Sequence, residues 1–313
     1  MYSDLQAAVN LGGHLTDWFK IGGGVRQGDN LAPTLFTIFI NSLTQEINQL
    51  DEGVRLENGT KVAILLFADD IVLLSETEIG LQRQLNTLNE WVKRNRMSVN
   101  MEKTKVIHFR SNNSKQTDTK FQLGSETVIV TSNYKYLGIT VNEFLDMSYS
   151  TKILATSASR ALGSLTAKYF NAKGLLYQTF TKLFNATVLP ILHYAAPIWG
   201  NKKYHHQEVI QQRAMRTFMG VGKKTPIPGL YGEMGWHPLS FYRKKDTIRY
   251  WLKLYNMDYN RLPKQIFLSD YIPALQGKKS WSKDIKDTLT ELNMRDTFFI
   301  FKTSAHVNCF QFQ

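Results

Sequence analysis

Two adjacent carboxylates are the residues of this chain best suited to chemistry. Asp69 and Asp70 lie inside an otherwise apolar run from Val62 to Leu74. The residues on both sides of the pair are typical of buried strands. Because an unpaired carboxylate is costly to bury, the pattern predicts either a solvated turn between two strands or a site for a hard cation such as Mg²⁺. The pair alone does not decide between these two interpretations.

The surrounding sequence predicts antiparallel strands with helices packed on them. Asn58-Gly59 is a strong hairpin signal between strands expected at 54–57 and 61–67, and a second hairpin would turn at the acidic pair. Apolar spacing predicts helices over 31–50 and 79–95. We therefore expect an α+β fold, with at least three antiparallel strands and its helices on one face of the sheet.

Later segments predict more short strands. Residues 97–100 and 105–109 have strand-like composition. Residues 127–131 and 136–141 predict a hairpin that is joined through Ser132-Asn133.

The apolar pattern takes on a helical period from about Ser150 onwards. This change predicts a mainly helical second half. Helices are expected over 152–170, 175–189, 205–219, 240–257 and 282–294.

Positive charge is concentrated in the same half of the chain. The net charge is +12, yet residues 1–150 hold 14 Lys and Arg against 17 Asp and Glu, whereas residues 151–313 hold 24 against 9. A basic region that also carries many aromatic residues is typical of nucleic-acid binding, because phosphates take the charge and bases stack on rings. A solubilising surface is the alternative. A hydrophobic content of 43% excludes a disordered chain.

The remaining composition indicates the compartment. Cys309 is the only cysteine, so no intrachain disulfide can form, and an intracellular location in cytoplasm or nucleus is expected. The apolar run 183–199 contains Pro190 and Pro197, which favour a buried helix end over a membrane span. His205-His206 lacks a third ligand at the spacing of a zinc site.

Four motifs resemble, in order and spacing, those of the reverse transcriptases of non-LTR (LINE-type) retrotransposons. Residues 24–36 resemble motif B, Phe67-Ala68-Asp69-Asp70 resembles the catalytic motif C, residues 91–105 resemble motif D, and Tyr136-Leu137-Gly138 resembles the motif E primer grip. The resemblance covers residues 20–145 well and the following region more loosely. It favours the catalytic interpretation of the acidic pair over the solvated turn.

The resemblance implies an RNA-directed DNA polymerase shaped as a right hand of fingers, palm and thumb. Such an enzyme uses Mg²⁺, with Mn²⁺ as an alternative, to add dNTPs to a DNA primer on an RNA template. Asp69 would ligate the catalytic ions with Asp70 in support, and Lys103 would lie near the triphosphate as a proton donor to pyrophosphate. The other implied contacts are Arg26, Gln27 and Gly28 to template or nucleotide, and Tyr136, Leu137 and Gly138 to the primer end.

The resemblance also implies three parts of the chain. Residues 1–145 would form a partial palm, residues 146–257 a basic, thumb-like helical region, and residues 258–313 a C-terminal extension of unassigned role. No association with a membrane is expected.

One part of the family's pattern is missing. The family takes a further metal-binding Asp from motif A, several tens of residues before motif B, but only 23 residues precede Gly24. Asp4 and Asp17 lack the apolar surroundings of that motif. We therefore expect the C-terminal part of a polymerase without its fingers and motif A, inactive in isolation, whose Asp69 strand exposes an unpaired edge.

Two other functions remain open at this point. The chain could be a relic that binds nucleic acid without chemistry. A hydrolase that uses two carboxylates is the third interpretation, but no second acidic centre in the sequence supports it.

Overall fold

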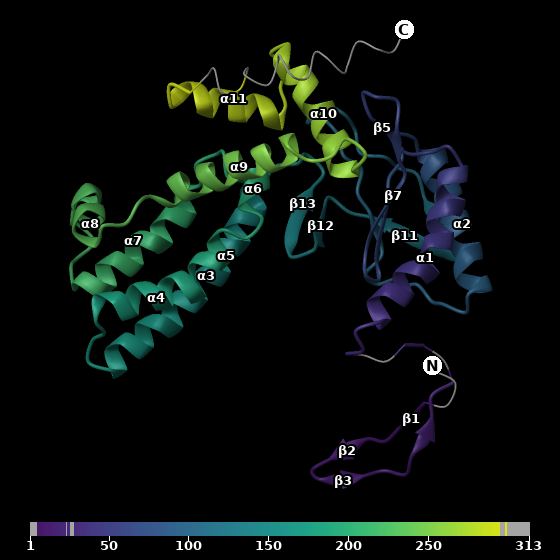
Figure 1. Cartoon of the computed structure of the whole chain (residues 1–313), viewed down its shortest axis with the longest axis horizontal. Helices are drawn as coiled ribbons and strands as arrows, with labels where there is room; N and C mark the ends of the chain where they lie inside the picture. The colour runs from purple at the N-terminus through teal and green to yellow at the C-terminus, as the bar shows by residue number, and fades with distance from the viewer. Residues whose placement is uncertain (1–4, 23, 26–27, 295–297, 299–313) are drawn as a thin grey trace. The chain divides into compact units, whose positions relative to one another are not determined.

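The computed structural model describes residues 5–22, 24–25, 28–294 and 298. The chain forms two compact units, the first from residues 1–104 and 118–129 and the second from 105–117 and 130–313. Small antiparallel sheets and two long helices make up the first unit, and helices dominate the second (Figure 1). This arrangement confirms the predicted α+β class with a mainly helical C-terminal region. Within the described ranges, no helix has both the length and the apolar character needed to cross a membrane.

Two predicted helices form the frame of the first unit. Helix α1 covers Ala32–Gln49 and helix α2 covers Glu78–Arg94, close to the predicted ranges. Helix α2 begins where the Thr77 hydroxyl accepts a hydrogen bond from the Gly80 N–H at 3.0 Å. The helices pack through Trp91, whose ring lies 5.3 Å from that of Phe39 and whose indole N–H donates to Ser42 at 2.9 Å. Trp91 is therefore a core residue.

The strands of the first unit are short and pair in antiparallel ladders. Near the N-terminus, β1 pairs with β4 and β2 with β3; further on, β5 pairs with β6, β7 with β8, and β10 with β11. Their bounds are β1 Gln6–Ala7, β2 Asn10–Leu11, β3 His14–Leu15, β4 Phe19–Lys20, β5 Val54–Arg55, β6 Lys61–Val62, β7 Ile64–Phe67, β8 Asp70–Leu73, β10 Phe121–Leu123 and β11 Glu126–Val130.

The prediction of one sheet with at least three strands around the acidic pair is wrong. The expected strand 61–67 divides at Ala63 into β6, which pairs with β5, and β7, which pairs with β8. Ala63 itself accepts a hydrogen bond from the Leu74 N–H at 2.8 Å. Gly53, with φ +138°, lies so close to Val62 that an added Cβ would be 2.9 Å from the Val62 carbonyl carbon. The apolar run therefore changes partner part-way along, which its composition did not indicate.

A second strand prediction is also wrong. Residues 127–131 do not pair with 136–141 through Ser132-Asn133. Instead, β12 (Asn133–Tyr136) pairs with β13 (Ile139–Asn142). The turn lies at Leu137-Gly138, where both residues have positive φ, +46° and +83°. A two-residue hairpin turn needs such angles, and the glycine supplies one of them without steric cost.

Only part of the other predicted short strands forms in the structure. Of the strands expected at 97–100 and 105–109, only β9 (Lys105–Val106) forms.

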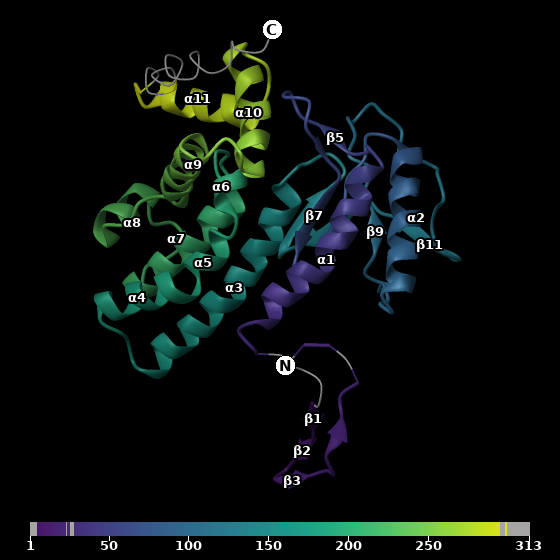
Figure 2. The ribbon, with the colours of Figure 1, turned by 45° about the vertical axis from the view of Figure 1, so that its right-hand side comes forward.

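The described part of the second unit has nine helices (Figure 2). They pack around two large aromatic-rich cores and a smaller one that includes Trp199 and Tyr204. One large core includes Phe180, Phe184 and Trp236; the other large core includes Trp251, Phe267 and Tyr271. The helices are α3 Ser148–Asn171, α4 Tyr177–Thr187, α5 Leu189–Leu192, α6 Ala196–Trp199, α7 His205–Met219, α8 Ile227–Met234, α9 Leu239–Tyr255, α10 Leu262–Leu275 and α11 Trp281–Glu291.

Five of these helices match predicted ranges, whereas the short helices α6 and α8 lie outside them. The longer helix α10 was also missed. Its sequence has proline at both ends, Pro263 in the first turn and Pro273 inside the last. Apolar residues also occur around much of its circumference, so no single stripe marks a buried face. Tertiary contacts of Phe267 and Tyr271 in the second core stabilise it instead.

A buried ion pair ties α7 to α9. The Arg243 side chain has no exposed surface, and its guanidinium donates to Glu208 and to Gln207, at 3.0 Å each. The Glu208 carboxylate also accepts the backbone N–H groups of Leu239 and Ser240, at 3.0 and 2.9 Å. Pro238, the residue before α9, has no side chain that could cap the helix. Glu208 therefore caps α9 and neutralises Arg243 at the same time.

Removal of this carboxylate is expected to be strongly destabilising. Glu208→Ala leaves Arg243 buried without its anion, which typically costs about 3–5 kcal/mol in the free energy of unfolding. Glu291→Ala is the matched control, because Glu291 pairs with Lys244 at 2.7 Å on the surface and should leave the transition where it is. Urea unfolding followed by circular dichroism measures both variants. Equal transitions for the two would contradict the assigned role of Glu208.

Candidate functional site

The acidic pair lies at the tip of the β7–β8 hairpin. Phe67 pairs with Asp70, and Ala68-Asp69 forms the two-residue turn between them. Ala68 has φ +52°, the left-handed conformation that the first position of such a turn requires. The predicted antiparallel hairpin is therefore confirmed, but its turn is Ala68-Asp69, one residue before the expected Asp69-Asp70, because Asp70 already pairs with Phe67.

Both carboxylates face solvent. Asp69 and Asp70 are exposed, and the neighbouring Phe67 side chain is 60% exposed. In the described part of the chain, neither carboxylate makes a hydrogen bond or an ion pair. Among the described strands, β7 and β8 pair only with each other. The carboxylate oxygens are thus open to an external ligand.

The donor chemistry suits a hard cation, but the ligand set is incomplete. Mg²⁺ prefers carboxylate oxygens and shares its shell with phosphates. Across the residues that the structure describes, no three or more His, Cys, Asp or Glu side chains gather as a metal site. Asp69 and Asp70 could supply one side of such a site, and a further ligand would have to come from elsewhere.

Lys103 lies on a tight loop of the same unit. The Asn100 side chain accepts the Lys103 N–H at 3.0 Å, and the Asn100 carbonyl accepts both the N–H and the hydroxyl of Thr104. These bonds fix the loop backbone and leave the Lys103 side chain exposed. The described structure shows no contact between Lys103 and the acidic pair.

The loop before α1 is described only in part. Gly28 has φ +86°, and the Asp29 carboxylate accepts the Leu31 N–H at 2.9 Å just before the helix begins. Arg26 and Gln27, expected to contact template or nucleotide, lie outside the described residues.

The expected primer-grip residues belong to the second unit. Tyr136 ends β12, and Leu137-Gly138 forms the turn to β13. The Tyr194 hydroxyl donates to the Leu137 carbonyl at 2.6 Å, and a Cβ on Gly138 would lie 3.0 Å from the Tyr194 ring. Sequence reasoning missed Tyr194, because no local pattern links residues so far apart.

The far end of the same hairpin is also anchored. Arg110 pairs with Glu143 at 3.0 Å, its backbone N–H donates to the Glu143 carbonyl at 2.9 Å, and its guanidinium lies 4.7 Å from the centre of the Phe144 ring. The hairpin is therefore held at its tip by Tyr194 and at its base by Arg110.

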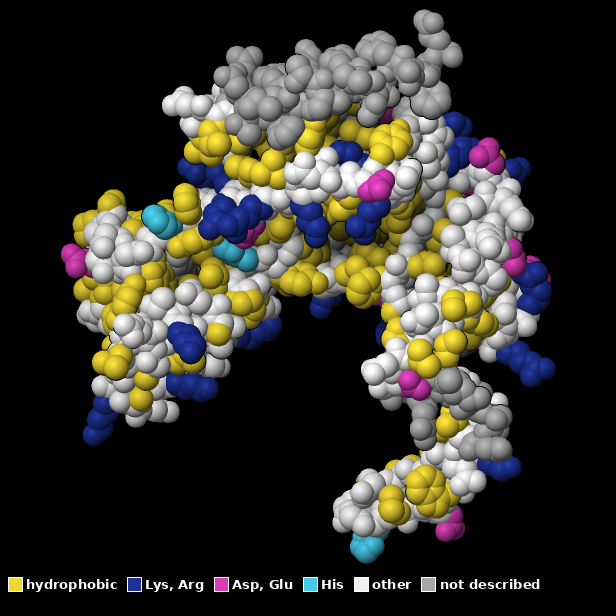
Figure 3. All heavy atoms as spheres, in the orientation of Figure 1, with side chains coloured by type: hydrophobic (Ala, Val, Ile, Leu, Met, Phe, Trp, Pro, Cys, Tyr) yellow, Lys and Arg dark blue, Asp and Glu magenta, His cyan; other side chains and the backbone are white. Residues whose placement is uncertain are grey.

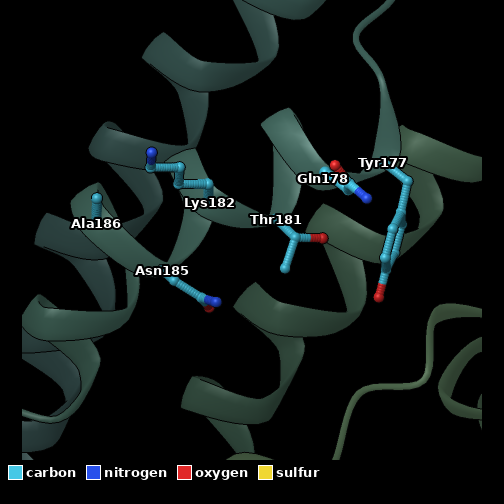
Figure 4. A pocket seen from close by; sticks show the side chains of 6 residues that line it. All are labelled: Tyr177, Gln178, Thr181, Lys182, Asn185 and Ala186. Atoms are coloured by element: carbon cyan, nitrogen blue, oxygen red, sulfur yellow. The ribbon is translucent and has the colours of Figure 1, made fainter.

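A hollow of about 540 Å³ lies along α4 (Figure 4). It contains none of the expected site residues, and its lining has one cation and no carboxylate or histidine. Its lining residues are Tyr177, Gln178, Thr181, Lys182, Asn185 and Ala186.

Comparison with known proteins decides the family of the first part of the chain. The model of the family described as reverse transcriptase (RNA-dependent DNA polymerase) matches residues 4–141. Residues 4–141 are a reverse transcriptase domain. All four motifs lie within this range, so the resemblance found in the sequence is confirmed at the level of the family.

Relatives of the domain come from insect mobile elements. The chain is 33% identical over 105 residues to a Pol polyprotein from the type-1 retrotransposable element R2 of Popillia japonica, which covers 34% of this chain and 17% of the relative. It is 26% identical over 236 residues to a probable RNA-directed DNA polymerase from transposon BS of Drosophila melanogaster. This match covers 72% of this chain and 26% of the relative. It is 26% identical over 212 residues to the RNA-directed DNA polymerase from mobile element jockey of Drosophila funebris. This match covers 64% of this chain and 22% of the relative.

These matches show that the chain is similar to RNA-directed DNA polymerases of the non-LTR retrotransposon type. The matched part spans about a quarter or less of the length of each of these relatives.

The Leu137-Gly138 turn of the reverse transcriptase domain can be tested directly. Gly138→Ala should lower the free energy of unfolding by more than 1 kcal/mol, because φ is +83° and the new Cβ meets the Tyr194 ring. Gly163→Ala in α3 is the control: its φ is ordinary, nothing lies near, and about 0.5–1 kcal/mol of stabilisation is expected. Hydrogen exchange of the β12 and β13 amides locates the effect. Unchanged protection in Gly138→Ala would contradict the contact with Tyr194.

Proposed function

We propose that residues 1–145 are part of the palm of an RNA-directed DNA polymerase and that Asp69 and Asp70 are its metal-binding carboxylates. The observation that carries this proposal is the exposed acidic pair at the tip of the β7–β8 hairpin, inside a reverse transcriptase domain. Two carboxylates without protein partners suit Mg²⁺ or Mn²⁺ that is shared with a triphosphate.

The reaction would be nucleotidyl transfer. The 3′-hydroxyl of a DNA primer attacks the α-phosphate of a dNTP on an RNA template, and pyrophosphate leaves. Bound divalent cations would offset the negative charge on the phosphates. Lys103, exposed on its fixed loop, would supply the proton that pyrophosphate takes up.

The other residues would position the substrates. We assign Tyr136, Leu137 and Gly138 to the primer end, where the anchored hairpin turn suits a grip on the backbone. A thumb-like role belongs in this proposal to residues 146–257. The proposed contacts to template or incoming nucleotide are Arg26, Gln27 and Gly28.

Catalysis by this arrangement would need another carboxylate. Two adjacent aspartates can line one side of a pair of cations about 3.5–4 Å apart but cannot enclose it. The described residues place no third acidic or histidine ligand beside them. The family resemblance assigns the facing ligand to motif A, so activity would depend on a segment that carries this motif.

Primer extension tests the assignment. We expect the 313-residue chain to extend no primer with Mg²⁺ or Mn²⁺, whereas fusion to the motif A segment of a relative should restore extension. Asp69→Ala should then abolish it, because the metal loses its ligand. Asp118→Ala is the control, since Asp118 is an exposed aspartate of the same unit outside the motifs.

Extension by the unaltered chain that is lost in Asp69→Ala would overturn the requirement for motif A. Asp17 would then be the first replacement ligand to test. Extension by the fusion that survives Asp69→Ala would overturn the catalytic role of Asp69 itself.

Charge favours a second candidate, a nucleic-acid-binding protein without chemistry. The net charge of residues 151–313 is +15, from 24 basic and 9 acidic residues. Binding of this kind would serve both candidates, so only the extension assay separates them.

Salt dependence tests the basic half. The full chain should bind single-stranded RNA with an affinity that falls steeply as the salt concentration rises, because Lys and Arg side chains that contact phosphates release counterions from the RNA. Little preference among sequences is expected. Fluorescence anisotropy of labelled RNA at several salt concentrations measures the slope, and a flat profile would show that the charge serves only solubility.

A further inference from the structure

Four aromatic rings form a cluster at the beginning of α9. The rings of His237 and Phe241 lie 4.7 Å apart at 36°. The Tyr242 ring lies 5.6 Å from Phe241 and 6.0 Å from His237, and the His193 ring lies 6.2 Å from Tyr242. His237 is exposed and Phe241 is 50% exposed, whereas Tyr242 is half-buried. An exposed pair of tilted rings in contact can indicate a binding surface, because most large aromatic surfaces in a folded chain are covered.

The backbone beneath the exposed rings is fixed. The Gln211 side chain donates to the His237 carbonyl at 2.9 Å, and Glu208 accepts the N–H groups at the start of α9. Trp236, the preceding residue, is buried against Phe184 with ring centres 4.7 Å apart. The rings therefore sit on a rigid base, and a ligand that stacks on them would lose little to the ordering of the protein.

Cations follow the rings along the same face of the helix. Phe241, Lys245 and Arg249 are all exposed and recur every four residues, so they lie in one row with about 6 Å between neighbours. Lys245 makes no ion pair with any described residue, and Arg249 approaches Asp246 only to 3.9 Å. Figure 3 shows Lys and Arg side chains gathered beside a histidine over the region where Figure 1 places α9.

His193, a half-buried ring of the cluster, is uncharged near neutral pH. Burial and, to a smaller extent, the nearby Arg243 lower the pKa of His193 to about 4, and Asp246 opposes the shift. Its Nδ1 lies 3.8 Å from the Asp246 carboxylate, and its Nε2 has no hydrogen-bond partner among the described residues. The start of α9 thus presents aromatic rings, and the exposed cations Lys245 and Arg249 follow them along the helix.

We propose that His237, Phe241 and Tyr242 form a stacking step for the bases of single-stranded nucleic acid, with Lys245 and Arg249 on its phosphates. Every base has a flat aromatic face and every nucleotide has a phosphate, so rings beside cations match a single strand without reading its sequence. A duplex hides its base faces and does not match this surface. The inference rests on the proposed nucleic-acid function and gives it a location.

Substitution at Phe241 in the full chain tests the stacking step. Phe241→Ala should weaken binding of a short oligouridylate about 5- to 100-fold, as expected when a stacked base loses its ring. Phe241→Leu should weaken it similarly, since it keeps an apolar surface without an aromatic face, and Phe241→Trp should retain binding. Tyr259→Ala is the control, because Tyr259 is 53% exposed in the same unit and lies outside the aromatic cluster.

Two further arms separate stacking from charge. Against an abasic strand of equal length, Phe241→Ala and the unaltered chain should bind alike. Lys245→Gln should lower the salt slope on oligouridylate by about 0.7, the value for one phosphate contact to a single strand. Unfolding midpoints equal to that of the unaltered chain show that each variant is folded.

Other results would overturn the stacking step. These are full binding by Phe241→Ala, an equal loss on the abasic strand, or a change in self-association of the chain in place of RNA binding, which would indicate a protein partner. A chain that binds no oligouridylate would overturn it too. Asp118→Ala, outside the motifs and in the other unit, should leave oligouridylate binding unchanged. The extension assay decides the polymerase proposal separately.

Discussion

The contact between Glu208 and Arg243 governs the second unit. A guanidinium without exposed surface is stable only beside an anion, and Glu208 supplies that anion while it also accepts the first N–H groups of α9. Burial lowers the pKa of Arg243, and the Glu208 carboxylate opposes this shift. One carboxylate thus fixes where α9 begins and which face it turns inward. The rings and cations on the opposite face take their positions from the same contact.

In the first unit, the corresponding constraint is the geometry of a turn. The acidic pair reaches solvent because Ala68 adopts a left-handed conformation and closes the β7–β8 hairpin in two residues. Leu137 and Gly138 do the same for the β12–β13 hairpin, with the Tyr194 hydroxyl on the turn carbonyl. Asp69, Leu137 and Gly138 therefore lie on short turns, held in place by the paired strands on either side.

The errors in the expected strands share one cause. Ala63 and its neighbours have the composition of a single strand, yet β6 and β7 pair with different partners. Residues 127–131 were expected to pair with 136–141, but β11 pairs with β10 and β12 with β13. Strand composition reports burial and not the identity of the partner, which depends on turns that only the folded chain reveals. Helix α10 was not predicted for a related reason: it has no apolar stripe and is stabilised by contacts with other helices.

The sequence by itself determined the α+β class, the helices with a clear apolar stripe, the antiparallel hairpin that carries Asp69 and Asp70, and the resemblance to the reverse transcriptase family. These features depend on residues close together in the chain, where helical periodicity, capping and turn chemistry act. Only the tertiary structure decided the strand pairing, the cap that Glu208 gives to α9, the contact of Tyr194 with Gly138 and the aromatic cluster at the start of α9. Each of these joins residues distant in sequence, and such contacts form only when packing has brought their elements together.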